Sequence, residues 1–313
     1  LTAEPGAGKT TVVPLRLLDE PWLRGKRIVM LEPRRLAARA SAARMASLLG
    51  EQVGETIGVT TRDDRRVSRA TRIEVVTEGI LTRRLQRDPE LEGCGLVIFD
   101  EFHERSQQAD LGLALLLDAQ RALDLRTAVM VMSATIDAPK VAALIGEPDP
   151  APVIECGGRT FDVEMHWRPR NKRDRLEPAV VQAVQWALDT EDEGDVLVFL
   201  PGMAEIRRTH EQLRGLDPRV EIHPLHGSLP LDEQDRAVAP GRPGIRKVVL
   251  STDIAESSLT VEGVTVVVDS GLARAPRFDP GNGLTRLTTI SVSRASADQR
   301  AGRAGRTRPG MAV

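Results

Sequence analysis

The chain has 313 residues, which is more than one ordinary domain needs and about the length of two. Its formal net charge is -2, from 43 Lys and Arg against 45 Asp and Glu, and 41% of its residues are hydrophobic. This composition excludes a histone-like basic binder, a low-complexity chain and a coiled coil. Only five of the 43 basic residues are lysines. An arginine excess suits a protein that grips phosphates, and an arginine-rich genome would produce it equally well.

The cysteines and the apolar runs bear on where the protein works. Cys94 and Cys156 stand alone, outside any disulfide or zinc-ligand spacing, which indicates a reducing compartment. The longest apolar runs, such as 111–117, are far shorter than the ~20 residues that span a bilayer, and no leader pattern opens the chain. We therefore expect no membrane partner and a cytoplasmic location. Residues 1–3 have the pattern of a strand end without its beginning, so we expect a fragment of a longer protein.

Short β-branched or apolar runs alternate with helical patterns along the chain, which is typical of an α/β fold with parallel sheets. Most runs are almost continuously apolar, as expected for strands covered by helices on both faces. A proline-rich break at 146–152 divides the chain, and we place two domains at 1–150 and 151–313. The predicted strands, in chain order, are 27–31, 72–77, 95–99, 127–133, 196–200, 247–251 and 264–269.

A glycine-rich segment at residues 3–11 lies between the first strand end and a helical pattern. It fits a phosphate-binding loop with alanine in place of the first glycine, because small residues let successive backbone N–H groups point at phosphate oxygens. In such a loop Lys9 reaches the β- and γ-phosphates and Thr10 ligates Mg²⁺. The alternative is a glycine-rich turn that caps a helix. The residues predicted to bind the nucleotide here are Pro5, Gly6, Ala7, Gly8, Lys9, Thr10 and Thr11.

Two acids, Asp100 and Glu101, end the apolar strand 95–99 at the edge of the predicted sheet where ligands bind. Both are candidate Mg²⁺ ligands, and Glu101 is the candidate group that orients the attacking water. Acids at a strand end are common, so Asp100 and Glu101 indicate a nucleotide site only in combination with the loop at 3–11. His103 follows directly and is a candidate relay of the nucleotide state, although a lone histidine is more often structural.

Polar side chains follow two further predicted strands. Ser133 and Thr135 end the strand at 127–133 and are candidate coupling residues, with a helix N-cap as the equal alternative. Arg34 and Arg35 follow the strand at 27–31. They are candidates for contact with a nucleic-acid backbone. The alternative is that they form a solvated turn.

The C-terminal run 296–306 is rich in arginine and glycine. A helix that turns ~100° per residue would place Gln299, Arg303 and Arg306 within a stripe about 60° wide. Glycine inside a helix costs roughly 1 kcal/mol relative to alanine, so two glycines here indicate a close approach to another surface. The stripe suits an arginine finger on a transferring phosphoryl group. An exposed basic helix is the alternative. No second phosphate loop follows residue 11, so we expect one nucleotide between the two halves.

Together these strings resemble the superfamily 2 helicases of the DEAH/RHA group, in particular the bacterial HrpB-type ATP-dependent helicases. Phe102, in place of alanine, itself points to the HrpB-like branch. The resemblance covers nearly the whole chain. The matching motifs lie at 5–11, 32–39, 77–81, 100–105, 133–135, 198–202, 225–229, 251–260 and 299–306.

The resemblance implies two tandem RecA-like domains, an ATP-binding domain at 1–150 and a helicase C-terminal domain at 151–313, with ATP and Mg²⁺ in the cleft between them. It implies a nucleic-acid-stimulated ATPase in a bacterial cytoplasm that translocates 3′ to 5′ on single-stranded RNA, or DNA, held through the backbone. A β-hairpin is expected within 272–290. The implied catalytic residues are Lys9, Glu101, Gln299, Arg303 and Arg306. The implied strand contacts are Arg34, Arg35, Thr77, Gly202 and Thr252, and the implied base and ribose contacts are Arg44, Thr260 and Glu262.

Two positions depart from the family pattern. Asp253 stands where asparagine is usual, and its carboxylate should weaken phosphate binding unless it is paired. Val238 occupies the place of an aromatic partner to Arg44, so base stacking should be one-sided. The helical and oligonucleotide-binding domains of such helicases are expected beyond this segment, which should hydrolyse ATP but unwind duplex poorly. The alternative functions are an ATPase that remodels a ribonucleoprotein or protein partner without unwinding, and a non-catalytic RNA-binding scaffold.

Overall fold

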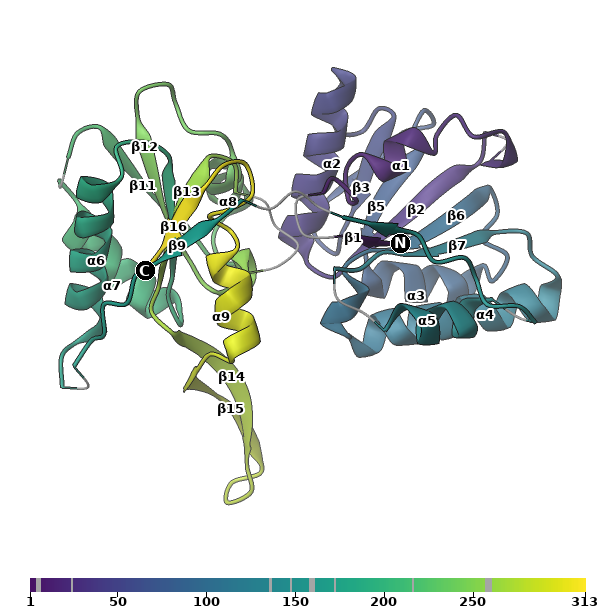
Figure 1. Cartoon of the computed structure of the whole chain (residues 1–313). Coiled ribbons are helices and arrows are strands. Elements are labelled where there is room, and N and C mark those ends of the chain that lie inside the picture. The colour runs from purple at the N-terminus through teal and green to yellow at the C-terminus, as the bar shows by residue number, and fades with distance from the viewer. Residues whose placement is uncertain are drawn as a thin grey trace. The chain divides into compact units, whose positions relative to one another are not determined.

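The computed structural model describes residues 1–3, 7–23, 25–134, 137–146, 148–157, 161–171, 173–215, 217–256 and 261–313. The chain forms two compact units, Leu1–Arg159 and Thr160–Val313, each built around its own sheet (Figure 1). The first unit extends past residue 150 because strand β8 (Glu155–Cys156) pairs in parallel with β1 (Thr2–Ala3) of the same unit. No helix in the described ranges is long and apolar enough to cross a membrane.

The first unit is a six-stranded sheet in the order β4-β3-β5-β2-β6-β7, parallel except for the β3–β4 pair. Its strands are β2 (Arg27–Glu32), β3 (Ile57–Thr60), β4 (Arg65–Arg66), β5 (Ile73–Thr77), β6 (Cys94–Phe99) and β7 (Ala128–Val131). Its α-helices are α1 (Val13–Arg16), α2 (Arg35–Leu49), α3 (Glu78–Arg87), α4 (Gln107–Leu123) and α5 (Ala138–Ile145), with 3-10 turns at Pro21–Leu23 and Phe102–Glu104.

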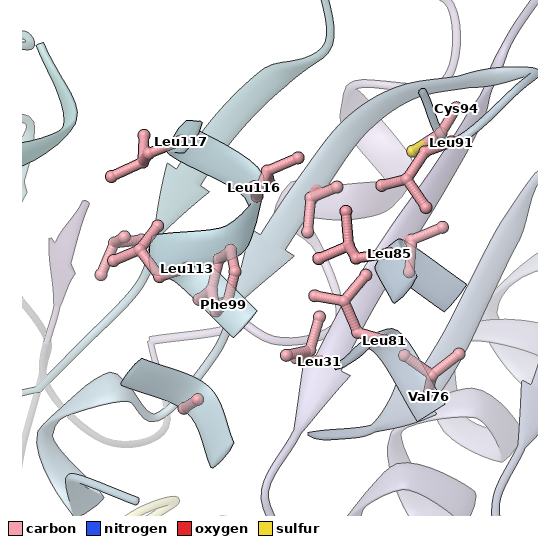
Figure 2. Close-up of a cluster of buried hydrophobic side chains, with 14 of the residues drawn as sticks. Leu31, Val76, Leu81, Leu85, Leu91, Cys94, Phe99, Leu113, Leu116 and Leu117 are labelled. Atoms are coloured by element: carbon pink, nitrogen blue, oxygen red, sulfur yellow. The ribbon is translucent and has the colours of Figure 1, made fainter. Parts of the chain in front are cut away.

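Both faces of this sheet are buried, which explains why its strands are apolar almost throughout. On β2, Val29 and Leu31 join one hydrophobic cluster with residues of α3 and α4, whereas Ile28 and Met30 join another with residues of α2. This alternation follows from the two-residue period of a strand. Figure 2 shows the first cluster, in which leucines of α3 and α4 surround Phe99 of β6.

The second unit is a six-stranded parallel sheet in the order β11-β12-β10-β13-β16-β9. Its strands are β9 (Val163–Met165), β10 (Asp195–Phe199), β11 (Val220–Leu225), β12 (Arg246–Ser251), β13 (Val264–Asp269) and β16 (Gly310–Ala312). Its helices are α6 (Leu176–Thr190), α7 (Met203–Leu213), α8 (Leu231–Val238) and α9 (Arg294–Ala301), with a 3-10 turn at Asp253–Ala255. An antiparallel hairpin of β14 (Leu272–Asp279) and β15 (Leu284–Ser291) extends from this body (Figure 1), as expected.

The seven predicted strands are confirmed as β2, β5, β6, β7, β10, β12 and β13, most of them within one residue at each end. The predicted strand 127–133 is longer than the observed strand β7, which is Ala128–Val131. The missed strands are short or lie at a sheet edge. β11 carries Pro224, which is tolerated because this strand is at the edge and pairs with β12 alone.

The two cysteines are free and differ in exposure, which leads to a simple labelling prediction. Cys94 is buried, and burial raises the pKa of its thiol to about 11, whereas Cys156 is exposed. Thiolate is the reactive form, so at pH 8 Cys94 is almost entirely unreactive. We expect iodoacetamide to modify Cys156 alone in the native protein and both cysteines after denaturation, read by mass spectrometry. Equal native labelling of both thiols would contradict the burial of Cys94.

An ion pair between the buried Glu74 of β5 and the half-buried Arg84 of α3 should make stability depend on pH. Glu74 accepts bonds from Arg84 Nη1 at 2.8 Å and from Thr60 Oγ1 at 2.6 Å. Burial alone would raise the pKa of the Glu74 carboxyl, but these partners outweigh it and the pKa is lowered. The stabilisation is therefore present above the unfolded-state pKa and disappears as the pH falls through the lowered folded value.

Replacing Arg84 by alanine should reduce the free energy of unfolding by about 3 kcal/mol, because it leaves the Glu74 carboxylate buried without its cation. Urea unfolding at pH 7 measures the reduction. The matched variant Arg83→Ala, one residue away and exposed, should change it by less than about 0.5 kcal/mol. If both variants unfold at the same urea concentration, the pair contributes nothing.

Candidate functional site

The glycine-rich loop turns tightly before α1, and its described residues are Ala7, Gly8, Lys9, Thr10 and Thr11. Gly8 has φ +82, and a Cβ there would lie 3.1 Å from Val12 Cγ2, so only glycine fits without strain. The backbone N–H of Val12 donates to the Gly8 carbonyl at 2.8 Å and closes the turn. Pro5 and Gly6, also predicted to line this loop, lie outside the described residues.

The loop meets the two acids at the end of β6. Lys9 is buried, and its Nζ lies 3.1 Å from Glu101 Oε1. Thr10 Oγ1 donates to Asp100 Oδ2 at 2.5 Å. The structure thus brings together four predicted site residues that are about 90 positions apart in the sequence. Because β6 is an interior strand of a parallel sheet, its carboxyl end delivers both acids to the same edge.

Asp100 is held where a charge is costly. It is buried, and its backbone N–H donates to the Leu31 carbonyl of β2 at 3.1 Å. Burial, and then the neighbouring Glu101 carboxylate, raise the pKa of Asp100 to about 6, while Lys9 and Thr10 act in the opposite direction. An ordinary aspartate is ionised well below this value. The site therefore favours a cation beside Asp100.

Glu101 links the loop to a short polar chain. Its backbone has φ +49 and ψ 36, a left-handed conformation that costs a residue other than glycine about 1–3 kcal/mol. Its side chain lies between Lys9 and His103, whose Nδ1 is 3.4 Å from Glu101 Oε2. The same Nδ1 is 3.3 Å from Ser133 Oγ. Two predicted coupling residues thus touch each other, and one of them touches Glu101; the third, Thr135, lies outside the described residues.

One acid at this edge was missed from the sequence. Glu32, the last residue of β2, is completely buried, and both its carboxylate oxygens are without a hydrogen-bond partner among the described residues. Burial, followed by the charges of Asp100 and Glu101, raises the pKa of Glu32 well above its ordinary value. The available signal was the same one that revealed Asp100, an acid that closes an apolar strand.

The arginines predicted to contact nucleic acid in the first unit have carboxylate partners. Arg34 Nε is 3.4 Å from Glu104 Oε2, and Arg35 bonds Asp63. A phosphate would have to displace or share these carboxylates. Thr77 is the N-cap residue of α3, at the end of β5. Arg44, predicted to stack on the base, lies exposed on α2.

The second unit holds the remaining predicted strand contacts. Gly202 is the N-cap residue of α7, and a Cβ there would lie 2.9 Å from Arg274 Cζ, so an arginine of the hairpin covers it. Thr252 is buried at the start of the 3-10 turn Asp253–Ala255. Glu262 lies half-buried just before β13, and Thr260 lies outside the described residues. Val238 is the last residue of α8.

The predicted helix through Arg306 is wrong. α9 ends at Ala301, so Gln299 is helical while Arg303 and Arg306 lie in the turns that follow. The cause is packing at Gly305, where a Cβ would be 2.4 Å from the Phe161 carbonyl oxygen. The expected close approach therefore exists, but it is to the backbone before β9. Arg303 is buried, and its Nε donates to the Glu256 carbonyl at 2.9 Å; Arg306 is half-buried.

Arg300, between these residues, has a different role. Its side chain is 1% exposed, its Nε lies 2.9 Å from Glu256 Oε2, and its Nη1 lies 2.9 Å from Asp269 Oδ1. The guanidinium carbon also lies 4.8 Å from the Phe199 ring centroid. These contacts join α9 to β10, β13 and the segment before residue 257. Arg300 thus holds the second unit together and is not available to a ligand.

Helicase families match both units. Residues 1–144 match the family described as DEAD/DEAH box helicase, and residues 179–308 match the helicase conserved C-terminal domain. The chain is 51% identical to the ATP-dependent RNA helicase HrpB of Escherichia coli strain K12, over all of this chain and 38% of that protein. The chain therefore spans well under half the length of this curated relative.

Solved structures of helicases also match this chain. The crystal structure of the Escherichia coli DEAH/RHA helicase HrpB matches 99% of this chain and 39% of its own, with a TM-score of 0.88 and 51% identity. A crystal structure of the E. coli DExH-box NTPase HrpB matches with a TM-score of 0.77 and 50% identity, over 99% of this chain and 38% of its own. The two units are RecA-like lobes, and the chain belongs to the DEAD/DEAH box helicase family, in its DEAH/RHA group.

Proposed function

We propose that this chain is the ATPase motor of a helicase, which hydrolyses ATP when it binds single-stranded nucleic acid and translocates along the strand from 3′ to 5′. The observation that carries the proposal is the contact of Lys9 and Thr10 with Glu101 and Asp100 at one sheet edge. RNA is the proposed substrate, because the relative from Escherichia coli is named an RNA helicase. The second candidate substrate is single-stranded DNA.

The site residues of both lobes have distinct roles in this proposal. The loop backbone and Lys9 bind the phosphates of ATP, and Lys9 passes from Glu101 to the γ-phosphate. The Glu101 carboxylate, released by Lys9, orients the attacking water and accepts its proton. In the second lobe, Gln299, Arg303 and Arg306 are proposed to stabilise the charge on the transferring phosphoryl group. Arg44, Thr260 and Glu262 are proposed to contact the base and ribose.

Magnesium fits the donors at this edge. The described residues contain no group of three or more His, Cys, Asp or Glu that could hold a metal. Mg²⁺, however, usually takes one or two protein oxygens and fills its other positions with phosphates and water. Thr10 and Asp100 supply such oxygens, and the raised pKa of Asp100 marks a site that favours a cation. Bound Mg²⁺ neutralises charge on the phosphates.

The strand contacts are proposed to be with the backbone alone. Arg34, Arg35, Thr77, Gly202 and Thr252 supply two guanidinium groups, two hydroxyls and the peptide group of a glycine, which suit phosphates and sugars. Binding should therefore be insensitive to sequence and weaken as salt increases.

The direct test is steady-state ATP hydrolysis with and without a single-stranded oligouridylate, combined with a duplex-unwinding assay. Stimulation by the single strand supports the proposal. Hydrolysis without any stimulation by RNA or DNA would contradict it and favour a remodelling ATPase. The same assay at rising salt should show stimulation fall, because salt weakens the binding of cationic side chains to phosphates.

His103 gives a separate prediction about coupling. Replacing it by alanine breaks the chain from Glu101 to Ser133, so the ratio of RNA-stimulated to basal hydrolysis should fall toward one. Ser133→Ala removes the other end of the same contact and should have the same effect. The double variant should be no more impaired than His103→Ala alone, because His103→Ala already removes the contact with Ser133. Additive effects would show that the two residues act separately.

A further inference from the structure

An exposed tryptophan lies within a basic segment of the second lobe. Residues 166–175 lead from the edge strand β9 to helix α6. Trp167 is 85% exposed, more than any other large hydrophobic side chain in the described part of the chain. Aromatic residues make up only 3% of the sequence, which makes this placement unusual.

The residues around Trp167 are strongly basic, although the whole chain has a net charge of -2. Four arginines and one lysine lie between positions 168 and 175, against a single acid, Asp174. In the described ranges no carboxylate forms an ion pair with Arg168, Arg170 or Arg173, whereas many arginines elsewhere have one. Arg170 instead donates to backbone carbonyls, those of Asn171 at 3.3 Å and Asp174. The positive charge of these three arginines is therefore not neutralised by an ion pair among the described residues.

A second aromatic ring fixes the start of the segment. The guanidinium carbon of Arg168 lies 4.6 Å from the Trp186 ring centroid, and the His166 ring lies edge-on to the same ring at 5.0 Å. Trp186 belongs to α6, whose other face is in the core of the lobe. His166 is also paired with Glu164 at 3.1 Å. The residues on both sides of Trp167 are thus held in place while its own indole stays in water.

We propose that Trp167 and the arginines that follow it form an additional binding site for single-stranded nucleic acid, in which a base stacks on Trp167 and phosphates contact Arg168, Arg170 and Arg173. Proteins that bind single strands without sequence preference combine these two features, an exposed aromatic ring and a basic path for the backbone. The charges favour a polyanion over an apolar protein partner, because arginines and a proline follow the indole. The site goes beyond the proposed motor function and requires neither ATP nor Glu101.

Binding of a fluorescein-labelled single-stranded oligouridylate to the chain, without nucleotide, tests the site. Trp167→Ala should weaken the affinity between about 5-fold and 150-fold, the range for one base stacked on an aromatic ring. Trp167→Phe should retain most of it. Arg168→Ala with Arg170→Ala should reduce the slope of log affinity against log salt by about 0.7 for each phosphate that is no longer neutralised. Matched controls are Trp22→Ala, in the first lobe, and Arg207→Ala with Arg214→Ala, exposed arginines of the second lobe.

Tryptophan emission adds a readout that a structural role would not change. Stacking should quench the emission of the wild-type chain on oligouridylate binding, and Trp167→Phe should remove this quenching while Trp22→Phe keeps it. Affinity and salt slope equal to those of the controls would overturn the proposal, as would quenching that persists in Trp167→Phe. Failure of the motor function would appear instead as hydrolysis unaffected by Glu101→Gln, in a separate assay.

Discussion

Replacing Glu101 by glutamine is expected to reduce the turnover number for ATP hydrolysis by about 10²- to 10⁴-fold, the contribution of a positioned general base. The amide has the size of the carboxylate and can still accept a hydrogen bond from Lys9, whose Nζ lies 3.1 Å from Glu101 Oε1. It cannot take a proton from water. Binding of ATP should persist, because the loop, Lys9 and Thr10 are unchanged.

The measurement needs two readouts. Steady-state hydrolysis with saturating oligouridylate should show the reduced turnover, and equilibrium binding of a fluorescent nucleotide should remain near the wild-type value. Glu92→Gln is the matched control, since Glu92 is an exposed acid of the same lobe. A Glu101→Gln variant that hydrolyses ATP at the wild-type rate would show that another group activates the water.

The sequence was most informative where a motif is local. The strand at 264–269 was predicted with the bounds that the structure has, because valines and a threonine run unbroken between a glycine and a strand-ending aspartate. The phosphate loop and the two acids that follow β6 are separate signals in the sequence. Their contact could be anticipated only from the rule that parallel strands present their carboxyl ends at one edge.

Features that depend on distant contacts were missed. Glu32 enters the acidic edge because β2 lies beside β6. Arg34 is paired with Glu104, the last residue of the 3-10 turn Phe102–Glu104. The end of α9 at Ala301 depends on the approach of Gly305 to Phe161, residues that are far apart in the chain. The helical periodicity of residues 296–306 does not reveal the approach of Gly305 to Phe161, so it predicts a helix that is too long.

Alanine variants of the two C-terminal arginines, Arg303 and Arg306, should differ in their stability, although both residues are proposed to support hydrolysis. Arg306→Ala is expected to lower the turnover number by about 10³- to 10⁵-fold, the range for an arginine finger. Arg303→Ala should lower turnover similarly and also reduce the free energy of unfolding by about 1.5–3 kcal/mol, because its buried guanidinium donates to the Glu256 carbonyl. Arg306→Lys tests geometry, since a lysine keeps the charge but lacks the bidentate fork.

Two other arginines of the same segment separate catalysis from folding. Arg308 is exposed and pairs with Glu193 at 2.8 Å, so Arg308→Ala should change stability by less than about 1 kcal/mol and leave hydrolysis intact. Arg300→Ala should destabilise the second lobe by about 3–5 kcal/mol, because it leaves two carboxylates without their cation. Hydrolysis and urea unfolding measured on all four alanine variants distinguish the roles. If Arg306→Ala retains the wild-type turnover number, Arg306 is not the arginine finger and another residue must supply it.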